Sequence, residues 1–258
     1  MSETSNESAD SIQNPKSKIQ NLDLKILLWD IDGTLLQSTK PGGFKEYFAK
    51  ALQRIYGTSG NILNVKAAGI TDVQIVYQAL KDDDFTIEKV VNKLPEFMKA
   101  MCEEMEKYLD AHETVYEMLP GVKEILRATA DAPQFVNALL TGNVGCSAEL
   151  KMKYIGVWDY FKDAPNAFGE ISHERRDLAI KAGELFSERF DFRFKSEQFI
   201  VIGDTAHDIA AARHFGAKVF CVETGRGIEK SDLEKEKPDA LLKDLSDTNE
   251  ILRLLKSL

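Results

Sequence analysis

Two aspartates two positions apart, Asp30 and Asp32, follow an apolar run and precede Gly33. A buried strand has no packing reason to end in two carboxylates, although Asp-Gly is also a common turn pair. Chemistry offers another explanation, because one carboxylate can attack a substrate while the other exchanges a proton with the leaving group or water. The neighbouring elements must decide between a turn and a reactive pair.

Two later apolar runs also end in polar residues. These residues are Thr141, Gly142 and Asn143 after run 135–140, and Asp204 and Asp208 after run 198–202. Ligands bind beyond the carboxyl ends of parallel strands, so we expect all of these side chains at one edge of a sheet. The four carboxylates would repel one another there, and a divalent cation would relieve the repulsion. An all-oxygen site favours Mg²⁺, held by Asp30, the carbonyl of Asp32, and Asp204.

The elements that must position these residues alternate along the chain. The buried-strand pattern covers 25–29, 135–140, 198–202, 217–222 and a shorter run at 239–242. The helical pattern covers 121–130, 146–155, 175–188, 206–214 and 247–257. This order predicts an α/β fold with a doubly wound parallel sheet.

One insertion interrupts the alternation. The residues between the first strand and Val122 contain no clear strand pattern and predict helices at 43–56, 71–80 and 86–110. The order of elements therefore predicts a second, smaller helical domain inserted at 40–118, and a core domain formed by 23–39 and 119–258. The polar residues 1–22 predict a disordered tail.

Composition restricts the class of partner. The 258 residues carry a net charge of −9, which argues against nucleic acid or an anionic membrane as the main partner. A small anionic substrate would need a local positive site. No apolar run approaches the ~20 residues of a membrane helix, and the start of the chain lacks the features of a signal peptide. We expect a cytoplasmic protein, and the sequence predicts no oligomeric state.

The three cysteines, Cys102, Cys146 and Cys221, are widely spaced and form no C-x-x-C motif. An odd and sparse set indicates a reducing compartment rather than a disulfide scaffold.

Three motifs, DIDGTL at 30–35, LLTGN at 139–143 and GDTAHD at 203–208, resemble those of the haloacid dehalogenase superfamily in its phosphatase branch. The resemblance covers nearly all of residues 25–245. It implies a Rossmann-like core, and the insertion resembles the C1-type cap of that superfamily. AGITD at 68–72 and LPGV at 119–122 resemble segments of the phosphoglycolate phosphatase-like subgroup.

The resemblance implies a role for each motif residue. Asp30 would attack phosphorus and become an aspartyl-phosphate. Asp32 would protonate the leaving alkoxide and then activate the hydrolytic water. Dehalogenases need no such acid, because a halide leaves without a proton, so Asp32 favours phosphoryl transfer. Thr141, with the backbone of Gly142 and Asn143, would bind phosphoryl oxygens.

The resemblance implies that Asp204 binds Mg²⁺ and that Asp208 supports the metal or a basic residue. The basic residue is usually a lysine before a proline, and the sequence has no such pair in the expected region. We assign its role to Arg175, with Arg176 and Lys181 as alternatives, because an arginine can bridge carboxylate and phosphate.

Two segments outside the motifs are further candidates. Thr71 and Asp72 could face the substrate from the cap, although Thr71 has the position of a helix N-cap. Gly225-Arg226-Gly227 follows a predicted strand and is expected to form a surface loop, with the edge of the pocket as the alternative.

These features together predict a Mg²⁺-dependent phosphatase that acts on a small phosphorylated metabolite. One alternative is a phosphosugar mutase similar to β-phosphoglucomutase, which uses the same two acids. A phosphonate hydrolase would instead need a cap lysine to form a Schiff base, and Lys40, Lys45 and Lys66 are the candidates by position. The third alternative is a phosphate- or metal-binding module without activity.

Overall fold

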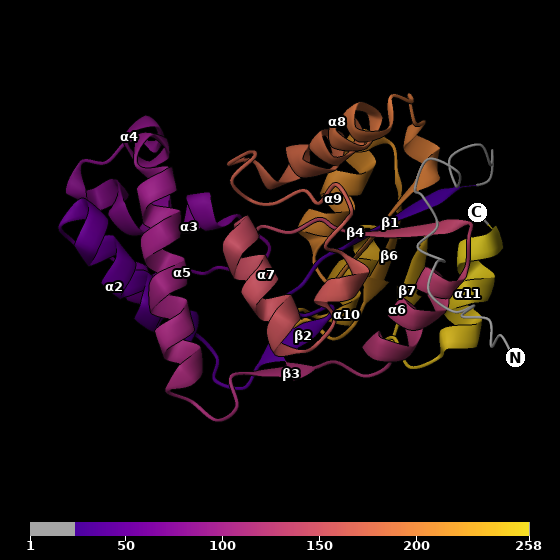
Figure 1. The fold of residues 1–258 in the computed structure, drawn as a ribbon, viewed down its shortest axis with the longest axis horizontal. Helices are drawn as coiled ribbons and strands as arrows, with labels where there is room; N and C mark the ends of the chain where they lie inside the picture. Colours follow the sequence, from indigo (N-terminus) through magenta and orange to yellow (C-terminus); the bar gives the residue numbers. More distant parts are fainter. Residues whose placement is uncertain (1–23, 258) are drawn as a thin grey trace, which may run out of the picture.

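A computed structural model describes residues 24–257 of the chain, so the predicted tail at 1–22 lies outside the described residues. Five parallel strands form one sheet with the order β4-β1-β5-β6-β7 (Figure 1). The strands are β1 (Lys25–Trp29), β4 (Phe135–Leu139), β5 (Phe199–Gly203), β6 (Lys218–Val222) and β7 (Ala240–Leu242). The predicted doubly wound α/β fold is confirmed.

Both faces of this sheet are buried, which explains why its strands are continuous apolar runs. In β1, Leu27 and Trp29 contact one apolar cluster and Ile26 and Leu28 contact another, because successive side chains point to opposite faces. Two helices cover the first face: α6 (Val122–Asp131) and α11 (Thr248–Ser257). Three helices cover the second face: α8 (Leu178–Phe190), α9 (Ala206–Phe215) and α10 (Lys230–Lys235).

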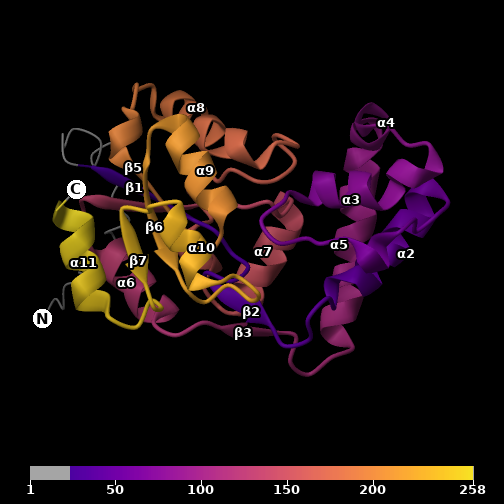
Figure 2. The same ribbon diagram turned by 180° about the vertical axis from the view of Figure 1, so that it is seen from behind.

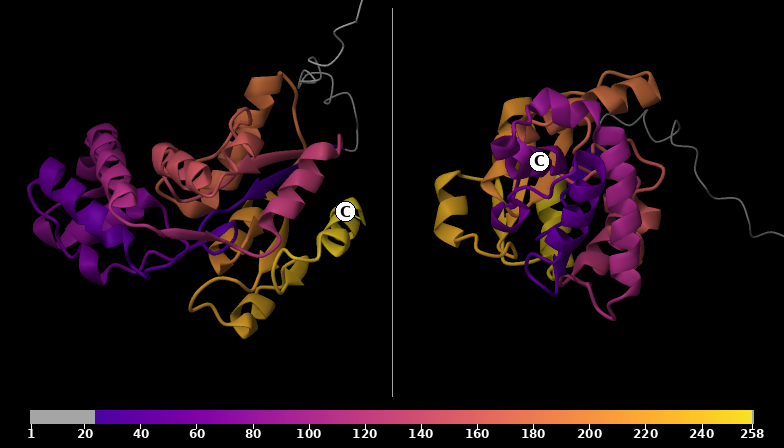
Figure 3. Two further views of the ribbon diagram at one scale, coloured as in Figure 1. Left: turned by 60° about the horizontal axis from the view of Figure 1, so that its bottom comes forward. Right: turned by 90° about the vertical axis from the view of Figure 1, so that its left-hand side faces the viewer.

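Four helices lie together beside the sheet-containing part of the molecule (Figures 1 and 3). They are α2 (Phe44–Tyr56), α3 (Asp72–Leu80), α4 (Ile87–Asn92) and α5 (Leu94–Asp110). The single helix expected at 86–110 is wrong, because the chain breaks at Lys93 between α4 and α5. Pro95 lies in the first turn of α5, where its missing N–H costs no hydrogen bond and its fixed φ suits a helix start.

A two-stranded antiparallel ribbon joins these helices to the sheet domain. It pairs β2 (Leu36–Ser38) with β3 (Tyr116–Met118), where the chain leaves and re-enters the core (Figures 1 and 2). The expectation of no strand in this interval is therefore wrong. Each strand has only three residues, which is too short to produce a readable alternation in the sequence.

The structure also corrects the interpretation of the cysteines. Cys102 on α5 and Cys146 on α7 (Gly145–Tyr154) form a disulfide that links a cap helix to a core helix. The two residues are 44 positions apart, and only the packing of the two helices brings them together. Cys221 is a buried free cysteine in β6. Among the described helices, none combines the length and apolarity that a membrane crossing requires.

Candidate active site

Three aspartates meet at the carboxyl edge of the sheet. Asp30 follows β1, Asp204 follows β5, and Asp208 lies in the first turn of α9. One carboxylate oxygen from each lies within 4.8 Å of the others, and all three residues are buried. Their meeting follows from the topology, because β1 and β5 are adjacent parallel strands whose ends coincide.

Arg175 is the cation that faces this cluster. Its Nη2 lies 3.0 Å from Asp30 Oδ1 and 2.5 Å from Asp208 Oδ1, and its side chain is only 7% exposed. Of the other two candidates for this role, Arg176 is exposed and lies near Asp177, and Lys181 is half-exposed and lies near Glu184. Of the three basic residues that the sequence proposed, the structure therefore brings Arg175 to the aspartates.

The cluster holds more negative charge than Arg175 neutralises. Burial raises the pKa of Asp30 to about 6, although the Arg175 charge opposes the shift. Burial, and then the charges of Asp30 and Asp208, raise the pKa of Asp204 well above its ordinary value. A hard divalent cation would favour the ionised form of these carboxylates, and the oxygen-only donor set fits Mg²⁺.

Asp208 differs from the other two acids in how its oxygens are used. Its Oδ2 accepts hydrogen bonds from the backbone N and the Oγ1 of Thr205, at 3.0 and 2.7 Å, while Oδ1 contacts Arg175. These bonds form a capping box that fixes the start of α9. Asp208 thus has the geometry of a residue that positions Arg175, and Asp30 and Asp204 are the more accessible candidates for metal ligands.

Gly33 explains the turn after the two acids of the first motif. Its φ of +88° lies in the left-handed region, and a Cβ at this position would come within 2.2 Å of Asp204 Oδ2. The chain can therefore turn away from β1 while its backbone stays close to the third aspartate. The Asp-Gly pair is a turn, as the simpler interpretation expected, and it is also part of the site.

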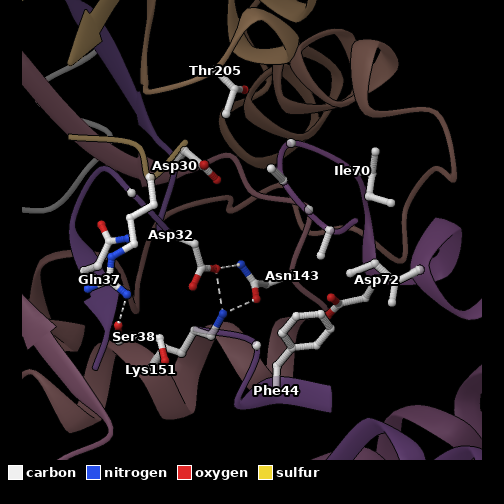
Figure 4. Close-up of a pocket in the computed structure, with 18 of the residues that line it drawn as sticks. Asp30, Asp32, Gln37, Ser38, Phe44, Ile70, Asp72, Asn143, Lys151 and Thr205 are labelled. Carbon is white, nitrogen blue, oxygen red and sulfur yellow. Dashed lines mark hydrogen bonds and ion pairs between the residues drawn. The ribbon is translucent and has the colours of Figure 1, made fainter. Parts of the chain in front are cut away.

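Asp32 is held away from the buried cluster by two donors. Its Oδ2 accepts from Asn143 Nδ2 at 2.8 Å and from Lys151 Nζ at 2.6 Å (Figure 4). Lys151 also donates to Asn143 Oδ1 at 2.6 Å, which closes a triangle of polar contacts. The side chain of Asp32 is 47% exposed, so its carboxyl group faces the cavity and not the protein interior.

Lys151 is a site residue that the sequence interpretation missed. It lies on α7, is almost fully buried, and its ammonium group lies 5.7 Å from the centre of the Tyr116 ring. Burial lowers its pKa, but the charge and hydrogen bond of Asp32, together with Tyr116 and Asp72, outweigh burial, so the net shift is upward. The available signal was its spacing: Lys151 lies four residues after Ser147, on the buried face of α7.

The second motif contributes the loop between β4 and α7. Thr141 is buried, and its Oγ1 accepts from Asn143 Nδ2 at 2.8 Å. Gly142 and Asn143 line the cavity beside Asp30. The loop therefore brings a hydroxyl and backbone N–H groups to the carboxyl edge of the sheet, where the sequence expected a phosphoryl group to bind.

The cap touches this loop through the segment that precedes α3. The backbone N of Asp72 donates to Gly142 O at 2.8 Å, and Asp72 Oδ2 accepts from Val144 N at 2.9 Å. Thr71 Oγ1 accepts from Gln74 N as the N-cap of α3 and donates to His173 O. Thr71 does not line the cavity, whereas Asp72 does. Both residues hold the cap against the core, and burial raises the pKa of Asp72 to about 6.

A cavity of about 290 Å³ lies between the core motifs and the cap. Its walls combine the acids of the site with aromatic side chains from the cap and the ribbon. The aromatic residues are Phe44, Tyr47, Phe48 and Tyr116. Lys40, Lys45 and Lys66 are not among the residues that line it. A Schiff base of the phosphonate hydrolase type therefore has no lysine in place among these three.

Comparisons with known proteins agree with this architecture. A family model described as HAD-hydrolase-like matches residues 178–248. No curated protein matches the chain. A predicted phosphoglycolate phosphatase from Haemophilus somnus is 20% identical, with a TM-score of 0.61, over 89% of this chain and 98% of that one.

Two further solved structures are similar. A candidate β-phosphoglucomutase from Bacteroides vulgatus is 19% identical, with a TM-score of 0.61, over 94% of this chain and 97% of that one. A predicted phosphatase from Clostridium acetobutylicum is 15% identical, with a TM-score of 0.59, over 89% and 99%. At these identities the likeness establishes a shared fold, and activity must be argued from the site itself.

Proposed function

We propose that this chain is a Mg²⁺-dependent phosphatase of small phosphorylated metabolites, of the haloacid dehalogenase type that its motifs resemble and with which it shares a fold. The observation that carries the proposal is a pair of carboxylates held in two different ways in one cavity. Asp30 is buried against Arg175, while Asp32 is half-exposed and held by Asn143 and Lys151. Two acids in contrasting environments support a division of roles between nucleophile and proton donor.

In the first step, an oxygen of Asp30 attacks phosphorus and the bond to the leaving oxygen breaks. Arg175 holds Asp30 in place and offers positive charge to the phosphoryl oxygens. The Nε of Arg175 is buried and has no hydrogen-bond partner among the described residues. A buried donor without a partner is costly, and an oxygen of the substrate would supply the missing acceptor.

Asp32 gives its proton to the leaving oxygen in the same step, which prevents the release of an alkoxide. Its Oδ2 is occupied by Asn143 and Lys151, so Oδ1 is the oxygen left to exchange the proton. In the second step, Asp32 takes a proton from water, and the water attacks the aspartyl-phosphate on Asp30. The bond between phosphorus and Asp30 breaks, which releases inorganic phosphate and regenerates the Asp30 carboxylate and the protonated Asp32.

Mg²⁺ would be held by Asp30 and Asp204, with the carbonyl of Asp32 as a further ligand. When bound, the ion would offset the negative charge of the carboxylates and the phosphoryl group and so allow them to approach. The raised pKa values of Asp30 and Asp204 support a cation at this position.

Phosphate release from a panel of small phosphomonoesters tests the proposal, with the Asp30→Asn variant as the blank. We expect Mg²⁺-dependent release from at least one ester and no release after treatment with a chelator. The variant should lose activity by at least ~10⁴-fold, since it removes the nucleophile. Release that persists in the variant, or its absence for every ester, would reject the phosphatase.

A phosphosugar mutase is the second candidate, supported by the fold shared with the candidate β-phosphoglucomutase. Such an enzyme would use Asp30 and Asp32 in the same way but return the phosphoryl group to a second hydroxyl of the sugar. Conversion of one sugar phosphate isomer into another without net phosphate release would identify it.

A further inference from the structure

Three cationic side chains line the cavity, and they differ in how they are paired. Arg175 contacts Asp30 and Asp208, and Lys151 contacts Asp32. Arg226 is the third, and no carboxylate among the described residues lies within 4.0 Å of its guanidinium group. Among the cations that line the cavity, the exposed Arg226 is therefore the one whose charge no described carboxylate offsets by direct contact.

Neutral groups hold Arg226 in place. Its Nη1 donates to the carbonyl oxygen of Ser38 at 2.7 Å. With the amide of Gln37 turned to satisfy its neighbours, Gln37 Oε1 accepts from Arg226 Nε at 3.0 Å, and Gln37 Nε2 donates to Thr224 O at 3.2 Å. These contacts orient the guanidinium group without cancelling its charge, and they leave three of its five N–H groups for a ligand.

The loop that carries Arg226 is anchored to the active site. Thr224 Oγ1 donates to Gly33 O at 2.5 Å, in the turn that follows the two motif acids. A Cβ on Gly225 would lie 2.2 Å from Asp204 Oδ2, so only glycine lets this backbone pass so close to the aspartate. The position of Arg226 is thus tied to the reacting groups and not only to the surface.

Arg226 is held by residues that lie on the side of Asp32 away from Asn143. Gln37 and Ser38, which bind it, lie on one side of Asp32, and Asn143 and Asp72 lie on the other (Figure 4). In the proposed mechanism Asp32 protonates the leaving oxygen. The leaving group therefore lies beside Asp32, in the cavity that Arg226 also lines.

We infer that Arg226 binds a second anionic group of the substrate, carried on the leaving group. This inference rests on the proposed phosphatase function and names its substrate class: small phosphomonoesters that also carry a carboxylate or a second phosphate. The cavity of about 290 Å³ corresponds to roughly ten water volumes, which suits a small leaving group. An arginine can bind either anion through paired N–H groups.

Matched pairs of synthetic esters test the inference. Carboxymethyl phosphate is compared with ethyl phosphate, and propane-1,3-diyl bisphosphate with propyl phosphate, so each pair differs mainly in the second charge. The readout is the ratio of kcat/KM for the charged ester to kcat/KM for its uncharged partner. The pair with the larger ratio identifies the anion as carboxylate or phosphate.

We expect the charged ester to be preferred by the wild type and the Arg226→Gln variant to lower that ratio by about tenfold or more, because a charge-assisted contact is lost. Arg226→Lys should restore part of the preference, since it keeps the charge. Arg127→Gln removes an exposed arginine of α6 that does not line the cavity, and it should leave the ratio unchanged. An unchanged ratio in Arg226→Gln would overturn the inference, even if both rates fell together.

Calorimetric binding of the same esters separates this inference from the proposed function. The titrations use the Asp30→Asn background, with and without Arg226→Gln, so that no ester is consumed. If the wild type releases no phosphate but Arg226→Gln still weakens binding of the charged esters selectively, the phosphatase proposal fails and the anion site stands. If Arg226→Gln leaves the affinity for the charged ester of each pair unchanged relative to its uncharged partner, the anion site is rejected.

Discussion

Asp32 is placed for proton transfer by contacts on only one of its oxygens. Lys151 and Asn143 both bind Oδ2, which fixes the rotation of the carboxyl group and leaves Oδ1 facing the cavity. A general acid needs such an orientation as much as it needs a suitable pKa, because the proton must travel along a short path. Lys151 is therefore a positioning residue in the proposed reaction.

The Lys151→Met variant should lose this orientation. We expect kcat to fall roughly tenfold to hundredfold for alkyl phosphates, less than the full contribution of a general acid. For aryl phosphates, the rate of the initial burst of phenol release should fall much less. A phenolate is a good leaving group and needs little help from a proton donor. The control is Lys153→Met, an exposed lysine of the same helix that pairs with Glu149. Equal losses for both ester classes would show that Lys151 supports only the fold.

Asp72 links the protonation of the cap to the stability of the chain. Burial raises its pKa from 3.8 to about 6, so the folded state binds the proton more tightly than the unfolded state. Between about pH 4 and 6 the folded chain therefore holds more protons, and the free energy of unfolding falls as pH rises. The two-unit shift corresponds to an upper bound of roughly 3 kcal/mol.

The Asp72→Asn variant tests this linkage. Asparagine keeps an oxygen that can accept from Val144 N but carries no charge. We expect the free energy of unfolding of the variant to fall less between pH 4 and 6 than that of the wild type, because the asparagine that replaces Asp72 has no proton to release. Urea denaturation at several pH values measures it, and Asp82→Asn, at an exposed site, is the matched control. A decline of equal size in wild type and Asp72→Asn would contradict the assignment.

At the scale of elements, helices α5 and α7 tie the cap to the core. Cys102 and Cys146 join them covalently, and α7 also carries Lys151 on its buried face. The cap loop before α3 makes a second attachment through Gly142 and Val144. The cap thus touches the core at the second motif, where the proposed reaction requires a fixed geometry.

Removal of the disulfide should weaken this attachment. For the Cys102→Ser, Cys146→Ser double variant we expect a free energy of unfolding lower by about 2–4 kcal/mol, because the crosslink restricts the unfolded chain. Guanidinium denaturation with and without a dithiol reductant measures the effect. The reductant should shift the wild type to the stability of the variant and leave the variant unchanged. A wild type that does not respond to the reductant would show that the bond contributes nothing.

At the scale of the whole molecule, the site exists only when distant segments are folded together. Asp30 and Asp204 are more than 170 residues apart in the chain and approach within 4.8 Å through the pairing of β1 with β5. A ligand that binds both carboxylates therefore binds the folded state alone and should stabilise it by mass action.

Mg²⁺ at about 100 times its dissociation constant should stabilise the chain by about 2.7 kcal/mol. This corresponds to an increase in Tm of roughly 5–10 °C for a chain of this size. Thermal unfolding with Mg²⁺ and with a chelator measures the difference. The Asp204→Asn variant should lose most of the increase, because it removes one proposed ligand. No increase in the wild type at millimolar Mg²⁺ would argue against a metal at these aspartates.

Local pattern was enough to predict the sheet and the edge where the acids lie. Buried parallel strands are continuous apolar runs, and the residues that follow them must lie at one edge whatever the details of packing. This reasoning placed Asp30 and Asp204 correctly at one edge. It failed for β2 and β3, because three-residue strands carry no readable period.

Tertiary structure alone decided the contacts between segments that share no local pattern. Lys151 reaches Asp32 across 119 positions, Cys102 meets Cys146 across 44, and Arg226 binds Ser38 across 188. Each of these residues has an ordinary sequence environment, as a helix lysine, a lone cysteine or a loop arginine. The sequence determined which strands end in acids, since that depends on hydrophobic periodicity along the chain. The pairing of cations and cysteines depends on how helices and loops pack in three dimensions, which no single local pattern encodes.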